Sequence, residues 1–175
     1  RLFMELPQVL TSFPPLGIVL VVIIGSGLAE RSGFFAAALK GLVRAVPKPL
    51  LTLTIVFAGV QANIASDAGY VVLIPLAAVV FASAGRHPVA GLSAAFAGVA
   101  GGFAANFAIT PGDGILSGMT QAAAALIDKG YKVEITANWY FLSALVPIYT
   151  IVGTLVCERI VEPRLNAGAP WTHVA

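Results

Sequence analysis

The chain has 175 residues, of which 58% are hydrophobic and only 10% charged, and its mean hydropathy is +0.92. A soluble domain carries about 25% charged residues and keeps a large part of its surface wet, so this composition excludes a water-soluble fold. The net charge of +2 forms no basic patch, which argues against nucleic acid as a partner, and the single Cys157 cannot form a disulfide within the chain. We therefore expect an all-α integral membrane protein that contacts membrane lipid. The first residue is not Met and the sequence ends abruptly, so we also expect a piece of a longer protein.

Two helices are predicted in the first part of the chain. Residues 10–29 form an apolar run that is long enough to cross the ~30 Å hydrocarbon core as a transmembrane helix. Residues 33–46 contain Lys40 and Arg44, which are four positions apart and therefore share one helical face. We interpret this second segment as an amphipathic helix that lies in the membrane interface.

Two short apolar blocks follow, at residues 50–64 and 70–84, with the polar sequence NIASDAG near the point where they meet. Each block has about 15 residues, or ~22 Å of helix, which is short of the ~30 Å core of a bilayer. We therefore predict a re-entrant helical hairpin over residues 49–85. Two complete but slightly short spans are the alternative.

Residues 88–127 are predicted to form a discontinuous transmembrane helix that is broken near 106–114, where the sequence TPGDG interrupts it. Small residues recur at helical spacing in its first half. Among them, Gly98 and Gly102 form a GxxxG pair, a spacing that lets helix backbones approach closely.

A last transmembrane helix is predicted at residues 139–157, with Trp139 and Tyr140 as interfacial aromatics, and a cytoplasmic tail follows at 158–175. Basic residues fall mostly on one side of this arrangement, which the positive-inside rule makes the cytoplasmic side. That side carries Arg31, Lys40, Arg44, Lys48, Arg86, Arg159 and Arg164, and the other side carries Lys129 and Lys132.

Both predicted helix breaks contain an asparagine and an aspartate. Backbone leaves its helix inside a membrane only where protein or water satisfies the freed groups, and secondary transporters bind substrates and ions at such breaks. Carbonyls at a helix C-terminus attract cations, and N–H groups at the next N-terminus attract anions. The candidate substrate- or ion-binding residues are Asn63, Ser66, Asp67, Asn106 and Asp113.

Asp67 is the most informative of these residues, because an ionised aspartate at the centre of a membrane costs on the order of 3 kcal/mol. It is either the N-cap of the helix that starts near Gly69, a cation or proton site at the hairpin tip, or a residue of a wet loop. The first two roles are compatible with each other. Asn63 and Ser66 offer neutral oxygens of the kind that hard cations accept, so these two residues and Asp67 form a candidate Na⁺ site. We expect no other cofactor.

The other candidates have structural alternatives. Asn63 and Ser66 are equally typical of local turns. Asn106 lies on the small-residue face and suits an interhelical hydrogen bond. Asp113 in PGDG suits a surface turn, and Gln61 suits a polar packing contact in an apolar helix.

Three stretches of the sequence resemble the p-aminobenzoyl-glutamate transporter (AbgT) family. They are GLAERSG, the long segment at 62–107 that begins ANIASDAGYVVLIPLAA and ends AANF, and ANWYF with the later ERIVEPRL. The resemblance implies a much longer chain with two inverted repeats, each with a re-entrant hairpin, in which this sequence is the N-terminal repeat. It also implies a homodimer in the bacterial inner membrane, crossing it several times. Family members import p-aminobenzoyl-glutamate or export sulfonamide antimetabolites.

The same resemblance assigns roles to the candidate residues. Asp67 matches an aspartate that is important for transport in the family, and NIAS occupies the place where related folds bind Na⁺. Asn106 and Asp113 match the asparagine and aspartate of the family's second break, although TPGDG departs from the family's usual sequence there.

We therefore predict a secondary active transporter, not an enzyme, that couples a cation or a proton to the movement of a small anionic aromatic substrate. A bare Asp67 would repel a carboxylate at the hairpin tip, and a bound proton or Na⁺ would remove that repulsion. Two alternatives stay open. An intramembrane aspartyl protease would use Asp67 and Asp113 with their carboxylates about 3 Å apart, and an ion channel would need a continuous pore lining.

Overall fold

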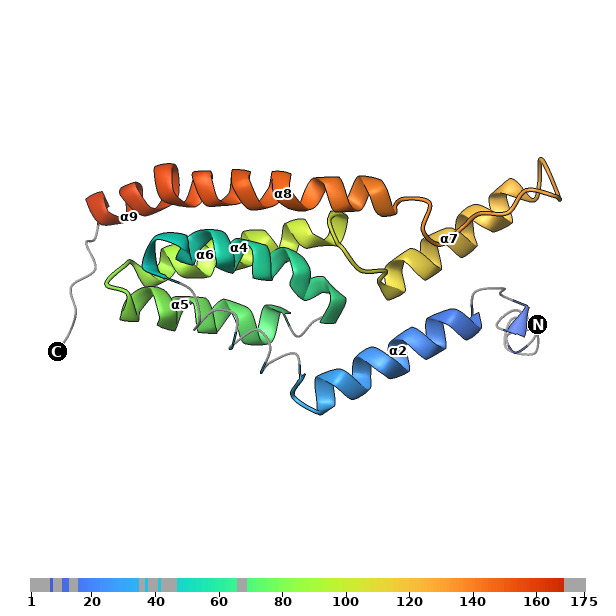
Figure 1. Ribbon diagram of the computed structural model, residues 1–175, viewed down its shortest axis with the longest axis horizontal. Helices are drawn as coiled ribbons and strands as arrows, with labels where there is room; N and C mark the ends of the chain where they lie inside the picture. Colours follow the sequence, from blue (N-terminus) through green and yellow to red (C-terminus); the bar gives the residue numbers. More distant parts are fainter. Residues whose placement is uncertain are drawn as a thin grey trace.

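The computed structural model describes residues 7, 11–12, 16–34, 37, 41, 47–65 and 69–168. Every regular element among these residues is helical (Figure 1). The α-helices are α2 (Leu16–Arg31), α4 (Leu51–Ala62), α5 (Ile74–Ser83), α6 (Pro88–Gly101), α7 (Pro111–Ala124), α8 (Trp139–Val156) and α9 (Glu162–Gly168). Short 3₁₀ turns are η1 (Lys48–Leu50), η2 (Asn63–Ala65) and η4 (Gly102–Ala104), and π-helical turns are η3 (Gly69–Leu73) and η5 (Cys157–Val161).

Helix α4 and the η3–α5 segment are the two arms of a helical hairpin. At one end, the Arg86 side chain that follows α5 reaches Thr52 in the first turn of α4. At the other end, Gly69 of η3 lies against Ala62 at the end of α4. We call these ends the base and the tip of the hairpin. The arms therefore run out and return, while the prediction that they turn back inside the bilayer stays a prediction.

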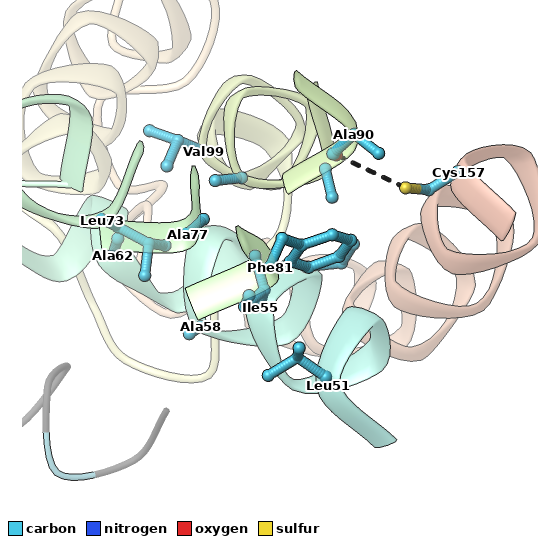
Figure 2. Close-up of a cluster of buried hydrophobic side chains, with 13 residues drawn as sticks. Leu51, Ile55, Ala58, Ala62, Leu73, Ala77, Phe81, Ala90, Val99 and Cys157 are labelled. Atoms are coloured by element: carbon cyan, nitrogen blue, oxygen red, sulfur yellow. Dashed lines mark hydrogen bonds between the residues drawn. The ribbon is translucent and has the colours of Figure 1, made fainter. Parts of the chain in front are cut away.

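Helix α6 packs closely against both arms because glycines remove the side chains at the contacts. A Cβ atom on Gly98 would lie 2.6 Å from the carbonyl oxygen of Val56 in α4, and one on Gly91 would lie 2.5 Å from that of Ala77 in α5. The small-residue face of this segment thus serves helix approach. Figure 2 shows the core between these helices, which includes Leu51, Ile55, Ala58, Ala62, Leu73, Ala77, Phe81, Ala90, Val99 and Cys157.

Both π-helical turns end two residues before a proline, Pro75 in one case and Pro163 in the other. A proline within a helix lacks an N–H donor, and its ring clashes with the carbonyl four residues earlier. A wider turn moves that carbonyl aside and lets the helix continue. The helix beyond residue 157 is continuous for this reason: α8, η5 and α9 follow one another to Gly168, so the first part of the predicted tail is helical.

By length and apolar composition, the continuous helix Trp139–Gly168 is the one helix of the described residues that suffices to cross a membrane. Three other apolar helices are shorter, at Lys48–Ala62, Gly69–Ser83 and Pro88–Ala104. The chain leaves its helix between η4 and α7, within the broken segment 88–127 of the sequence prediction. Most of the predicted interfacial segment 33–46, including Lys40 and Arg44, lies outside the described residues.

Candidate functional site

The tip of the hairpin begins where α4 passes into the 3₁₀ turn η2. Asn63 opens this turn and is 7% exposed. Its Nδ2 donates to the carbonyl oxygen of Val99 at 2.7 Å, which is in the last turn of α6. This bond fixes the orientation of the amide and leaves Oδ1 as the Asn63 atom that can ligate a cation. Ser66 and Asp67, the other predicted tip residues, lie outside the described residues.

The second break begins at the C-terminal end of α6. Gly102 to Ala104 form the turn η4, and the backbone then becomes extended at Ala105. Asn106 is 3% exposed, and its Nδ2 donates to the carbonyl oxygen of Gly102 at 2.9 Å. The Oδ1 atom of Asn106 is buried and finds no hydrogen-bond partner among the residues that the structure describes. Because such an atom costs about 1–3 kcal/mol, it indicates a place where another group completes the structure.

Gly102 brings the two breaks together. A Cβ atom at this residue would lie 2.4 Å from Nδ2 of Asn63 and 2.4 Å from the carbonyl oxygen of Val60. The amide of Asn106 binds the carbonyl of the same glycine from the other side of the chain break. Both asparagines therefore donate to carbonyls at the end of α6, and both keep an amide oxygen beyond these bonds.

The backbone of Phe107 is held from two directions. Its N–H donates to Oε1 of Gln61 in α4 at 3.4 Å, and its carbonyl accepts from Nε1 of Trp139 at the start of α8 at 2.9 Å. These bonds satisfy backbone groups that the helix break sets free, as a membrane interior requires. Nε2 of Gln61 is buried and has no partner within the described part of the chain. Gln61 thus makes the polar packing contact that the sequence indicates, through its Oε1 atom.

Asp113 has a different role in the described structure. Its Oδ2 accepts from the backbone N–H of Thr110 at 2.7 Å and from the Thr110 hydroxyl at 2.9 Å. Asp113 is the third residue of α7, so this is the reciprocal half of a capping box at the helix start. The acid stabilises the N-terminus of α7 through the helix dipole as well. A role for Asp113 in binding substrate or ion stays a prediction.

A groove of about 300 Å³ lies beside the second break, with Phe57 and Phe107 in its wall. Their ring centroids are 6.3 Å apart. Oγ of Ser143 in α8 is buried here and has no hydrogen-bond partner in the described ranges. Pro147 lacks the N–H that would otherwise donate to the Ser143 carbonyl. Sequence reasoning missed Ser143, although a serine four residues before a proline in an apolar helix is a signal for it. The other lining residues are Val146, Thr150 and Ile151.

Within the described residues, no group of three or more His, Cys, Asp or Glu side chains is placed to hold a metal ion. A cation bound near the described parts of the two breaks would therefore depend on neutral oxygens. Amide oxygens and backbone carbonyls are ligands that hard cations accept.

The family model for AbgT transporters matches residues 1–173. The chain belongs to the AbgT putative transporter family. This confirms the family resemblance, and with the helical structure it confirms the expectation of an all-α membrane protein. The AbgT family is one of transporters, not of enzymes, so the aspartyl-protease alternative loses its basis.

Three AbgT relatives illustrate the similarity. The p-aminobenzoyl-glutamate transport protein of Escherichia coli (strain K12) is 41% identical over 164 residues, which are 92% of this chain and 32% of that protein. The crystal structure of the Alcanivorax borkumensis YdaH transporter, described as having an unusual topology, aligns with a TM-score of 0.90 at 45% identity, over 99% of this chain and 36% of its own. Neisseria gonorrhoeae MtrF, whose structure is described as illuminating a class of antimetabolite efflux pumps, aligns with a TM-score of 0.83 at 47% identity, over 93% of this chain and 32% of its own. The chain thus spans about a third of the length of these relatives.

In this AbgT chain, the candidate residues fall into three groups. Asn63 and Asn106 meet at Gly102, at the junction of the two helix breaks. Asp113 lies beyond them, at the start of α7. Ser66 and Asp67 are in the part of the tip outside the described residues.

Proposed function

We propose that the full-length protein is a secondary active transporter that couples a proton or Na⁺ to the movement of p-aminobenzoyl-glutamate or of sulfonamide-type antimetabolites. The observation that carries this proposal is the junction at Gly102, where two interrupted helices meet and two amides are oriented by backbone carbonyls. The names of the Escherichia coli and Neisseria gonorrhoeae relatives support the substrate class. A homodimer in the inner membrane of a bacterium is part of the same proposal.

The proposed cation site combines the amide oxygens at this junction with Asp67. Helix α4 ends at Ala62 and α6 ends at Gly101, so the negative ends of two helix dipoles point into the junction. Asn63 and Asn106 would add neutral oxygens, and Asp67 would add the charge that a monovalent cation or a proton balances. Ser66 is the remaining proposed ligand.

The proposed substrate site uses the opposite polarity. The π-turn η3 starts at Gly69, so its N–H groups are the positive end of the second arm of the hairpin. A substrate carboxylate is favoured there only once a proton or Na⁺ has neutralised Asp67. Cation and substrate then bind together in import, or exclude each other in export. The groove walled by Phe57 and Phe107 is apolar and suits an aromatic ring.

The test is Asp67→Asn in the full-length protein, reconstituted in proteoliposomes with labelled p-aminobenzoyl-glutamate under imposed H⁺ or Na⁺ gradients. We expect the substitution to abolish cation-driven flux while protein abundance stays near that of the wild type. Glu134→Gln, in the exposed loop before α8, is the matched control and should leave flux unchanged. Cation-driven flux that persists in Asp67→Asn would contradict the proposal, and flux that does not saturate with substrate would favour a channel.

A further inference from the structure

Arg86 occupies a fixed place at the base of the hairpin. The backbone N–H of Arg86 donates to the carbonyl of Phe81 at 2.9 Å, and that of Gly85 donates to the carbonyl of Ala82 at 3.0 Å. Gly85 has a φ of 79°, so the end of α5 is a Schellman motif with glycine in the left-handed position. The motif also brings the side chain of Arg86 back over α5, where its guanidinium lies 4.4 Å from the centroid of the Phe81 ring.

The guanidinium of Arg86 joins three helical segments. Nη1 donates to the Thr52 hydroxyl in α4 at 2.7 Å. Nε donates to Oε1 of Glu162 in α9 at 2.9 Å, and Nη2 donates to Oε2 of the same carboxylate. Glu158 in the π-turn η5 is 3.7 Å from Nη2. One side chain therefore contacts both arms of the hairpin and the end of the last helix.

These contacts are partly shielded from solvent, which makes them costly to break. The side chains of Arg86 and Glu162 are only 20% and 14% exposed. A bidentate arginine–carboxylate pair is among the strong hydrogen-bond arrangements in proteins, and removing one partner leaves the other charge buried. The hydrogen bond with Glu162 raises the pKa of Arg86 above its usual value, so the guanidinium stays charged.

We propose that Arg86 is a positioning residue that makes the hairpin and the α8–α9 helix one rigid body, so that the tip is held from its base. The rigid body itself does not depend on the proposed transport function, but the movement that we infer from it does. During transport, the rest of the protein would move relative to this body, and the tip would not move relative to α9.

The structural test uses two spin labels in the otherwise complete full-length protein. Val71 near the tip is 74% exposed, and Asn166 on α9 is also exposed, so both accept a label after substitution by cysteine. Cys157 is buried, and any cysteine in the rest of the full-length protein is replaced by serine before labelling. With labelled protein diluted into an excess of unlabelled protein, so that distances within one protomer dominate, we expect one narrow distance distribution by pulsed electron resonance, unchanged by Na⁺, by acid pH or by p-aminobenzoyl-glutamate. A shift of the distance with any of these would overturn the proposal.

The variant Arg86→Gln should broaden that distribution, and Arg164→Gln, which changes an exposed arginine of α9, should not. A narrow distribution in Arg86→Gln would equally overturn the proposal. This measurement needs no transport activity. If the wild-type protein showed no coupled flux, the proposed function would be contradicted. The measured distances would still decide whether Arg86 is a positioning residue.

A kinetic test distinguishes positioning from general loss of structure. Arg86→Gln should raise the half-saturating concentration of the driving cation about tenfold, or ~1.4 kcal/mol, with a smaller fall in maximal rate. The exchanged pair Arg86→Glu with Glu162→Arg should recover part of this loss. A fall in maximal rate alone, without recovery in the exchanged pair, would contradict a positioning role.

Discussion

At the base of the hairpin, each of the three nitrogens of one guanidinium makes a hydrogen bond, whereas beside the tip two amide side chains have atoms that no described residue pairs. Arg86 at the base uses Nε, Nη1 and Nη2 on Thr52 and Glu162. Near the tip, Oδ1 of Asn106 and Nε2 of Gln61 are buried and have no hydrogen-bond partner among the described residues. Buried polar groups in folded proteins are nearly always satisfied, so the described residues complete the hydrogen bonding at the base but not near the tip.

The largest effect is expected from Gly102→Ala, because the added methyl would meet backbone as well as the Asn63 side chain. Its Cβ would lie 2.4 Å from the carbonyl oxygen of Val60, which cannot move without shifting α4. We expect a loss of about 3 kcal/mol in the free energy of unfolding, at the upper end for overpacking. The loss of stability is measured as a lower unfolding temperature of the purified full-length protein, with size-exclusion chromatography after heating as the readout.

Gly112→Ala is the matched control for this prediction. Among the described residues, a Cβ there would meet the Thr110 hydroxyl alone, at an ordinary contact distance of 3.5 Å. We expect unchanged or slightly higher stability, since alanine favours helix over glycine. Equal stability of both alanine variants would mean that the junction at Gly102 is not closely packed.

Much of this junction follows from the sequence, but its partners do not. The GxxxG pair of Gly98 and Gly102 predicts close helix approach, and Asn106, on the same face, is buried as expected. The identity of the neighbouring element is long-range information: Asn63 and the carbonyl it binds are 36 residues apart. The hydrophobic periodicity of a sequence describes one helix at a time, so it cannot predict which residues of two different helices form a hydrogen bond.

The base of the hairpin shows the same limit more strongly. The sequence RHP at residues 86–88, between two apolar segments, predicts a plain cytoplasmic turn. Nothing near it in the sequence indicates an acidic partner for Arg86. Glu162 is 76 residues away and lies in what the sequence predicts to be a tail. Helix η5–α9 extends past the predicted boundary because a π-turn accommodates Pro163, a local adjustment that propensity rules do not contain.

At the base, Thr52→Val removes one hydroxyl with little change of shape. Thr52 is fully buried, and its Oγ1 accepts from Nη1 of Arg86. We expect the free energy of unfolding to fall by about 1–2 kcal/mol, because a donor of a charged group loses its partner. Thr120→Val, at an exposed threonine whose hydroxyl bonds only within its own helix, should change stability by less. Cation dependence of transport should respond to Thr52→Val in the same direction as to Arg86→Gln, and an opposite response would separate the two residues.

At the tip, Asn106→Ala should have the smallest effect on folding and a clear effect on function. The substitution loses the hydrogen bond to the Gly102 carbonyl, worth about 1 kcal/mol, but it also removes a buried oxygen that has no partner. These terms nearly cancel, so we expect the unfolding free energy to stay within about 1 kcal/mol of wild type.

The response to Na⁺ tests whether Oδ1 of Asn106 is a cation ligand. If it is, added Na⁺ should raise the unfolding temperature of the wild type much more than that of Asn106→Ala, because a ligand stabilises only the state that binds it. Asn138→Ala, at an exposed asparagine whose side chain does not cap α8, is the control and should keep the full response to Na⁺. A large loss of stability in Asn106→Ala with an unchanged response to Na⁺ would instead place Asn106 with the residues that only hold the fold together, as Arg86 and Thr52 do at the base.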